Sequence, residues 1–80
     1  DCCARSRILV ERSIAGRFTD ALVAATEALK VGDPLDETTQ MGPLISAGQR
    51  RTVRGYVEVG VAEGATLRCG GGEIAGDGFY

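Results

Sequence analysis

The stretch IAGRFTDALVAATEALK, residues 14–30, decides how this sequence folds. Its apolar side chains recur at spacings of three and four residues, at Ile14, Phe18, Ala21, Leu22, Ala25 and Leu29. This period places them on one face, so the stretch predicts an amphipathic α-helix whose apolar face contacts a core. Ser13 offers a hydroxyl for the N-cap, Lys30 places a cation in the last turn, and Gly32 predicts a left-handed stop.

The second half of the chain predicts another helix. Ser46 and Gln49 have the spacing of a capping box, in which a hydroxyl and an amide side chain satisfy backbone groups at a helix start. This helix is expected to run to about Glu63, with Gly64 ending it. Residues 31–45 carry both prolines of the chain together with apolar anchors, which predicts an ordered loop rather than a flexible linker.

Two short β-prone runs flank the helices, RILV at residues 7–10 and TLRC at residues 66–69. The predicted order is therefore strand, helix, loop, helix, strand, which is an α/β arrangement. Both runs need more sheet than 80 residues contain, and a core of this size is marginal. We therefore expect residues 1–80 to be incomplete as a stand-alone fold and to belong to a larger protein.

Composition excludes several classes of function. Nine basic and eleven acidic residues give a net charge of −2, which argues against nucleic-acid or anionic-membrane partners. No apolar run approaches the roughly 20 residues of a membrane helix. An odd number of cysteines predicts reduced thiols and a cytoplasmic location. Histidine is absent, and Cys2, Cys3 and Cys69 do not supply four zinc ligands, so no metal site is expected.

The adjacent thiols of Cys2 and Cys3 lie close in sequence to Arg5 and Arg7. Nearby positive charge favours the thiolate, the reactive form of cysteine, so this spacing indicates a possible nucleophile. The alternative is a pair of small buried apolar side chains, which is the commoner role of such cysteines. The spacing alone leaves both interpretations open.

Basic residues also cluster in the second predicted helix, at Arg50, Arg51 and Arg54. They fall on its outer side, and the chain lacks the larger basic excess that phosphate binding requires, so they predict a solvated face. The triple glycine at residues 70–72 lacks the Lys-Ser/Thr ending of a phosphate-binding loop and predicts a wide turn.

Taken together, several blocks of the sequence resemble the aldehyde dehydrogenase superfamily. They occur in the family's order and spacing along the whole chain: CCARSRILV at 2–10, Phe18, KVGDP at 30–34, MGPLI at 41–45, Tyr56, EGA at 63–65 and GGG at 70–72. The resemblance implies that residues 1–80 are the N-terminal part of the cysteine-bearing catalytic domain of an NAD(P)-dependent enzyme. The Rossmann-like cofactor domain and the oligomerisation segment are then expected outside this chain.

The resemblance also implies site residues. The family's nucleophile lies five residues before the arginine of its Ser-Arg pair, and counting back from Arg7 gives Cys2. Its thiolate attacks an aldehyde to give a thiohemiacetal, hydride passes to NAD or NADP, and water hydrolyses the resulting thioester to a carboxylic acid. Gln49 matches a position that approaches the cofactor ribose, although Thr52 stands where relatives often carry lysine. A purely capping role for Gln49 stays open.

The remaining catalytic groups that the resemblance implies, a general-base glutamate and an oxyanion-binding asparagine, lie upstream of this chain. We therefore expect the isolated chain to be inactive. Its partners are expected to be a small aldehyde, the remainder of its own catalytic and cofactor domains, and further copies in a dimer or tetramer. Two alternatives remain: a small non-catalytic binding or structural module, and a relative that transfers the acyl group to coenzyme A.

Overall fold

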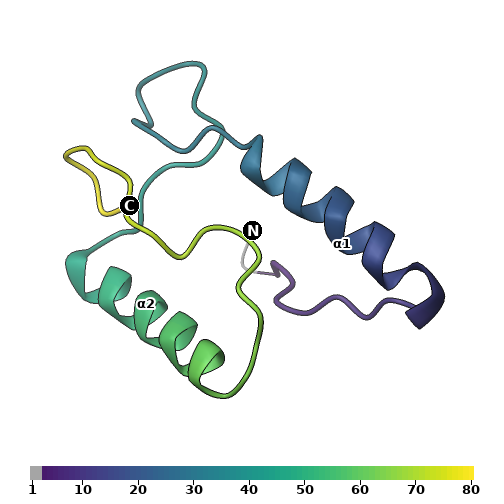
Figure 1. Ribbon diagram of the computed structural model, residues 1–80. Coiled ribbons are helices and arrows are strands. Elements are labelled where there is room, and N and C mark those ends of the chain that lie inside the picture. The colour runs from purple at the N-terminus through teal and green to yellow at the C-terminus, as the bar shows by residue number, and fades with distance from the viewer. Residues whose placement is uncertain (1–2) are drawn as a thin grey trace.

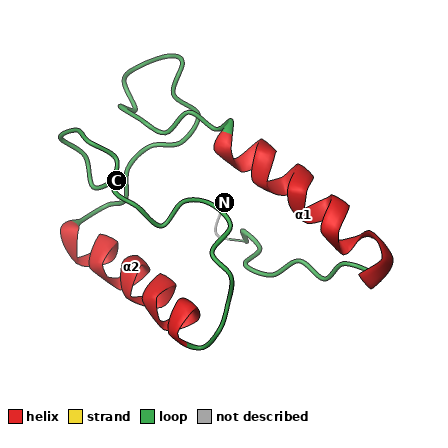
Figure 2. Ribbon diagram, viewed as in Figure 1, coloured by secondary structure: helices red, strands yellow, loops and turns green. Residues whose placement is uncertain are grey.

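The computed structural model describes residues 3–80 and contains two α-helices in that part of the chain (Figure 1). Helix α1 spans Arg12–Glu27 and helix α2 spans Ala47–Ala62. The two helices lie apart, and the described chain shows no contact between them. The other described segments are loops and turns (Figure 2). Both predicted helices are thus confirmed, but they do not share a core.

The N-terminus of α1 differs from the prediction that Ser13 caps it. The helix begins at Arg12, and Glu11 occupies the capping position. The Ile14 backbone N–H donates to Glu11 O at 3.1 Å, and the helix starts two residues earlier than predicted. Ser13 lies inside this first turn, where its Oγ donates to Glu11 Oε1 at 2.9 Å. The hydroxyl is therefore bound to the preceding carboxylate and does not serve as the cap.

The C-terminus of α1 lies at Glu27, before the predicted end at Lys30. The Lys30 backbone N–H donates to Gln40 Oε1 at 2.9 Å, and Lys30 O accepts from the Gln40 backbone N–H at 2.9 Å. These bonds pair Lys30 with the following loop instead of with another helical turn. The assignments of Lys30 to the last turn and of Gly32 as a left-handed stop are therefore wrong. The helix ends through Ala28, which is right-handed, and Gly32 has no positive φ.

The loop between the helices is ordered by polar contacts among its own residues. Lys30 Nζ donates to Asp36 Oδ2 at 3.1 Å and also contacts Thr38 Oγ1. Asp36 Oδ1 accepts from the Thr38 backbone N–H at 2.8 Å and from Thr38 Oγ1 at 2.7 Å. These donors, Thr38 first and Lys30 second, lower the pKa of Asp36 from 3.8 to about 2. The loop over residues 31–45 is ordered as predicted, but by these polar contacts and not by apolar anchors, since Leu35 and Ile45 are each 90 % exposed.

Helix α2 matches the sequence prediction at both ends. Ser46 Oγ accepts a hydrogen bond from the Gln49 backbone N–H at 3.0 Å, so Ser46 is the N-cap. The helix ends at Ala62, and Gly64 follows with a φ of +96°, a left-handed value that suits glycine. The Ala65 backbone N–H then donates to Gly60 O at 2.9 Å, which satisfies a carbonyl of the last turn.

The two predicted strands are absent from residues 3–80. Residues 7–10 and 66–69 have no ladder partner there, and a strand forms only where another strand pairs with its backbone. The described chain contains only isolated bridges, Val31 with Met41 and Leu44 with Phe79. The strand-helix-loop-helix-strand order is thus corrected to helix, loop, helix in this structure.

Burial agrees with the expectation that residues 1–80 are incomplete as a stand-alone fold. No side chain in residues 3–80 is buried. The apolar face of α1 is open, with Phe18 37 % and Leu22 42 % exposed, and Leu9 in the extended N-terminal segment is 97 % exposed. Segment 66–69 is joined to α1 by an ion pair between Arg68 and Asp20 (3.0 Å). Neither described helix combines the length and apolar character needed to cross a membrane.

The isolated 80-residue chain is expected to unfold without cooperativity, because helices of this length are marginal in water and no side chain of the described chain is buried. Far-UV circular dichroism should show partial helix that melts gradually, and calorimetry should show no heat-absorption peak. A sharp transition with an enthalpy near 0.7 kcal/mol per residue, typical of globular proteins, would instead indicate a stand-alone module.

The carboxylate of Asp36 is expected to titrate near pH 2, below its ordinary pKa of 3.8. Because its pKa is lowered in the folded loop, its contribution to loop stability is present above about pH 4 and is lost as the pH falls through about 2. Carbon-detected NMR of the side-chain carboxyl measures this pKa. Thr38→Val should raise it more than Lys30→Met. An unshifted pKa in the unaltered chain would contradict the loop geometry.

Candidate functional site

The predicted nucleophile, Cys2, lies outside the described residues, so its assignment stays a prediction. Its neighbour Cys3 is exposed, as are Arg5 and Arg7. The segment that follows Cys2 is therefore an open, extended stretch with two cationic side chains near the thiols in sequence.

The second predicted site residue, Gln49, stands in the first turn of α2. Its backbone N–H donates to Ser46 Oγ, while its side chain is exposed. In the described chain the carboxamide makes no hydrogen bond, so only the Ser46 half of the predicted capping box is formed. The capping function thus uses the backbone of Gln49 and leaves its side chain accessible to a ligand.

Thr52 lies one turn beyond Gln49, at the position where the resembling family often carries lysine. Its Oγ1 donates to Gly48 O at 3.2 Å within the helix. This bond directs the hydroxyl back to the helix backbone, and threonine does not supply the positive charge of the lysine.

The arginines around Gln49 do not form the uniformly solvated face that the sequence predicted. The guanidinium carbon of Arg50 lies 6.0 Å from the centroid of the Phe79 ring, a cation–π distance. Arg54 Nη1 forms an ion pair with Glu73 Oε1. Arg51, between them, is exposed. Sequence analysis missed these contacts because Glu73 and Phe79 lie in the tail, residues 73–80, which follows the predicted glycine turn and for which no contact was predicted.

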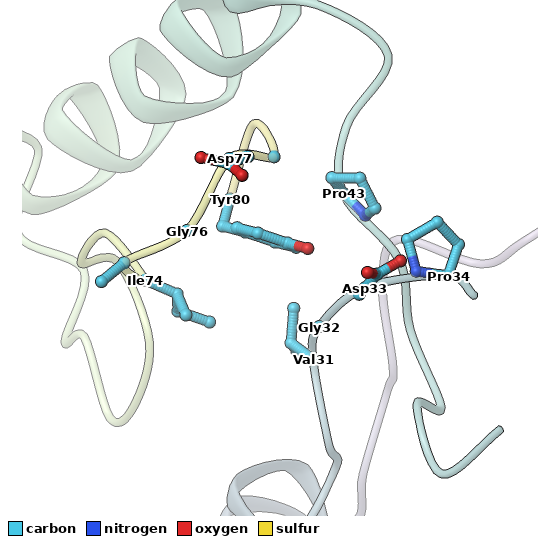
Figure 3. Close-up of a pocket in the computed structure, with 11 residues that line it drawn as sticks. Val31, Gly32, Asp33, Pro34, Pro43, Ile74, Gly76, Asp77 and Tyr80 are labelled. Carbon is cyan, nitrogen blue, oxygen red and sulfur yellow. The ribbon is translucent and has the colours of Figure 1, made fainter. Parts of the chain in front are cut away.

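A pocket of the described chain lies elsewhere. It has a volume of about 400 Å³ and opens between the loop at residues 31–34, Pro43 and the tail at residues 74–80. In Figure 3 the Tyr80 ring extends into it from the tail, and Asp33 lies on the loop side. Neither Cys3 nor Gln49 lines this pocket, so it is distinct from the predicted site.

Metal ligands do not gather in this part of the chain. Among residues 3–80, no group of three or more Cys, Asp or Glu side chains is placed to hold a metal ion. The site that the structure describes is therefore limited to an exposed carboxamide on a capped helix start, with two arginines held against the tail.

Comparison with known proteins places this geometry in a family. The sequence model of the "Aldehyde dehydrogenase family" matches residues 1–80. The chain is 51 % identical over 78 residues to betaine aldehyde dehydrogenase of Brucella ovis. The match covers 98 % of this chain and 16 % of that protein. It thus spans about a sixth of the length of the curated relatives that it matches.

Solved structures agree with the sequence match. The Mycobacterium tuberculosis aldehyde dehydrogenase complexed with NAD⁺ superposes with a TM-score of 0.95 at 44 % identity, covering 100 % of this chain and 17 % of that one. Betaine aldehyde dehydrogenase from Staphylococcus aureus in complex with NAD⁺ gives a TM-score of 0.84 at 42 % identity, covering 90 % and 14 %. On the family match over all 80 residues and on these superpositions, the chain belongs to the aldehyde dehydrogenase family.

Proposed function

We propose that these residues form the N-terminal part of the cysteine-bearing catalytic domain of an NAD(P)-dependent aldehyde dehydrogenase, which oxidises an aldehyde to a carboxylic acid. The observation that carries this proposal is the match to the family over the whole chain, including the cysteine segment. The NAD⁺ complexes of the M. tuberculosis and S. aureus proteins support the cofactor class.

Cys2 is the proposed nucleophile. Its thiolate adds to the carbonyl carbon of the aldehyde, the C=O electron pair moves to oxygen, and a tetrahedral thiohemiacetal forms. The Cys2 backbone N–H donates to the resulting oxyanion, where negative charge develops. Gln49 would help to hold NAD or NADP, which would supply the acceptor for the hydride of the former aldehyde carbon. Water then attacks the thioester at Cys2, and the acid and the thiolate are released.

Gln49 is the proposed cofactor-binding residue of this chain. An amide side chain both donates and accepts hydrogen bonds, which suits the hydroxyls of a ribose. The structure supports this role because only the backbone N–H of Gln49 takes part in the cap, as the donor to Ser46 Oγ. Its carboxamide is exposed. The Ser46 cap fixes the backbone from which this side chain extends.

Betaine aldehyde is the first substrate to test. The 51 % identity to the betaine aldehyde dehydrogenase of B. ovis supports it. An aldehyde with a quaternary ammonium group also suits an anionic residue beside the nucleophile, and Asp1 precedes Cys2 in the sequence. The dimeric or tetrameric state and the cytoplasmic location stay predictions.

Replacement of the nucleophile tests the mechanism. In the full-length protein, Cys2→Ala should lower aldehyde-dependent NADH formation by about 10³-fold or more, because no thiohemiacetal forms. Mass spectrometry of the unaltered protein, quenched during turnover, should find the acyl group on the peptide that contains Cys2.

The matched control is Cys3→Ala, which should retain most of the activity. Loss of activity in Cys3→Ala but not in Cys2→Ala would contradict the assignment. If acyl release requires coenzyme A rather than water, the protein is instead the CoA-acylating relative.

The cofactor role of Gln49 has its own test. Gln49→Ala should raise the Kd for the cofactor about two- to tenfold, the effect of losing one or two neutral hydrogen bonds. Because alanine keeps the backbone N–H that caps α2, the melting temperature should stay nearly unchanged. Ser46→Ala is the contrasting variant: it removes the cap and should lower the free energy of unfolding by about 1 kcal/mol. An unchanged Kd in Gln49→Ala would leave Gln49 with a capping role alone.

A further inference from the structure

The tail of the chain folds back onto the start of α2. Figure 1 shows the yellow C-terminal segment beside the first turn of this helix. The Leu44 backbone N–H donates to Phe79 O at 3.0 Å and forms an antiparallel bridge just before the helix cap. The approach is close: a Cβ atom at Gly78 would lie 2.7 Å from the Tyr80 ring and 3.0 Å from Pro43 Cβ.

Two arginine side chains of α2 contact this tail. Arg50 lies over the Phe79 ring and Arg54 pairs with Glu73. Residues four apart on a helix share a face, so the two arginines present one basic stripe to the tail. We refer to Arg50, Arg54, Glu73 and Phe79 as the tail clasp. It joins two positions of the tail to two successive turns of the helix.

The tail clasp acts on the turn that carries Gln49. Arg50 follows Gln49 directly, and the Leu44–Phe79 bridge holds the chain before the Ser46 cap. Together with the Ser46 cap, these contacts hold the first turn of α2, which makes no contact with α1 in the described chain.

We propose that Arg50 and Arg54 are positioning residues, which act through the tail clasp to hold the Gln49 side chain in the orientation that binds the cofactor ribose. This inference rests on the proposed function of Gln49. The arginines themselves need not touch the cofactor. When the tail clasp is broken, the turn samples other orientations, and the apparent affinity for the cofactor falls with the fraction of molecules in the competent one.

The exposure of the tail clasp sets the size and salt dependence of this effect. The side chains of Arg54 and Glu73 are 48 % and 53 % exposed. An ion pair this exposed is weak and is screened by salt, and a single exposed cation–π contact is of similar strength. Each contact should therefore change cofactor affinity modestly, and the Arg54–Glu73 contribution should shrink at high ionic strength.

The test is a charge reversal in the full-length protein, with cofactor binding followed by fluorescence titration. Arg54→Glu and Glu73→Arg should each raise the Kd for NAD⁺ about two- to fivefold at low salt, and the double variant should restore it. Phe79→Leu should also raise the Kd. Arg50→Lys keeps a cation over the ring, so it should raise the Kd less than Arg50→Leu does. The turnover number at saturating cofactor should stay constant throughout.

Arg51→Leu is the matched control, because Arg51 lies on the same helix turn but outside the tail clasp. It should leave the Kd unchanged. Variants of the tail clasp that lower the melting temperature without changing the Kd would overturn the inference and show that the contacts only stabilise the fold. Failure of the charge reversal to restore binding would overturn it as well.

Gln49→Ala separates this inference from the proposed function. In the Gln49→Ala background, breaking the tail clasp should weaken cofactor binding no further, since the group that it positions is gone. Additive losses would overturn the positioning role while leaving Gln49 as a cofactor contact. If Gln49→Ala alone has no effect on the Kd, the cofactor role of Gln49 fails, and the positioning role fails with it.

Discussion

Order in this chain depends on hydrogen bonds between polar groups, because none of its described side chains is buried. The Ser46 cap starts α2, and the Gly64 turn ends it. The Lys30–Asp36–Thr38 contacts and the pairing of Lys30 with Gln40 close the intervening loop. Each joins residues close in sequence, so each forms at a small cost in chain entropy.

The same constraint explains which parts of the fold were predictable from sequence. Helix periodicity and the Ser46 cap are local signals, and the structure confirms both helices and this cap. The ends of α1 were predicted wrongly because other groups bind the residues that were expected to form them. The Ser13 hydroxyl donates to the Glu11 carboxylate, and the Lys30 backbone N–H donates to the Gln40 side chain. The strands at residues 7–10 and 66–69 failed for a different reason, since a strand needs a partner that the described chain does not supply.

The candidate site also has one part that could be predicted from sequence and one part that could not. Gln49 could be placed from its spacing to Ser46, and its assignment as a cofactor ligand came from the family resemblance. The contacts of Arg50 and Arg54 could not be read from sequence, because Glu73 and Phe79 are 19 and 29 residues away. A signal was nevertheless present: two arginines four residues apart, followed by a tail with two acidic and two aromatic side chains, Glu73, Asp77, Phe79 and Tyr80. Such a pattern suggests a paired face as readily as a solvated one.

The two proposed functional residues stand in different physical situations. The backbone of Gln49 is held by the Ser46 cap within this chain, while its side chain is exposed and makes no hydrogen bond among the described residues. Cys2 precedes an extended segment without a sheet partner, and the chain contains no histidine to act as a base. In the proposed mechanism the remaining catalytic groups come from other polypeptide, so the thiol would reach its full reactivity only on packing against it. The apolar face of α1 is also open. Packing against other polypeptide would therefore cover this face and activate the thiol in the same step. A cysteine that gains its reactivity only on assembly is protected from oxidation and side reactions in the unassembled chain.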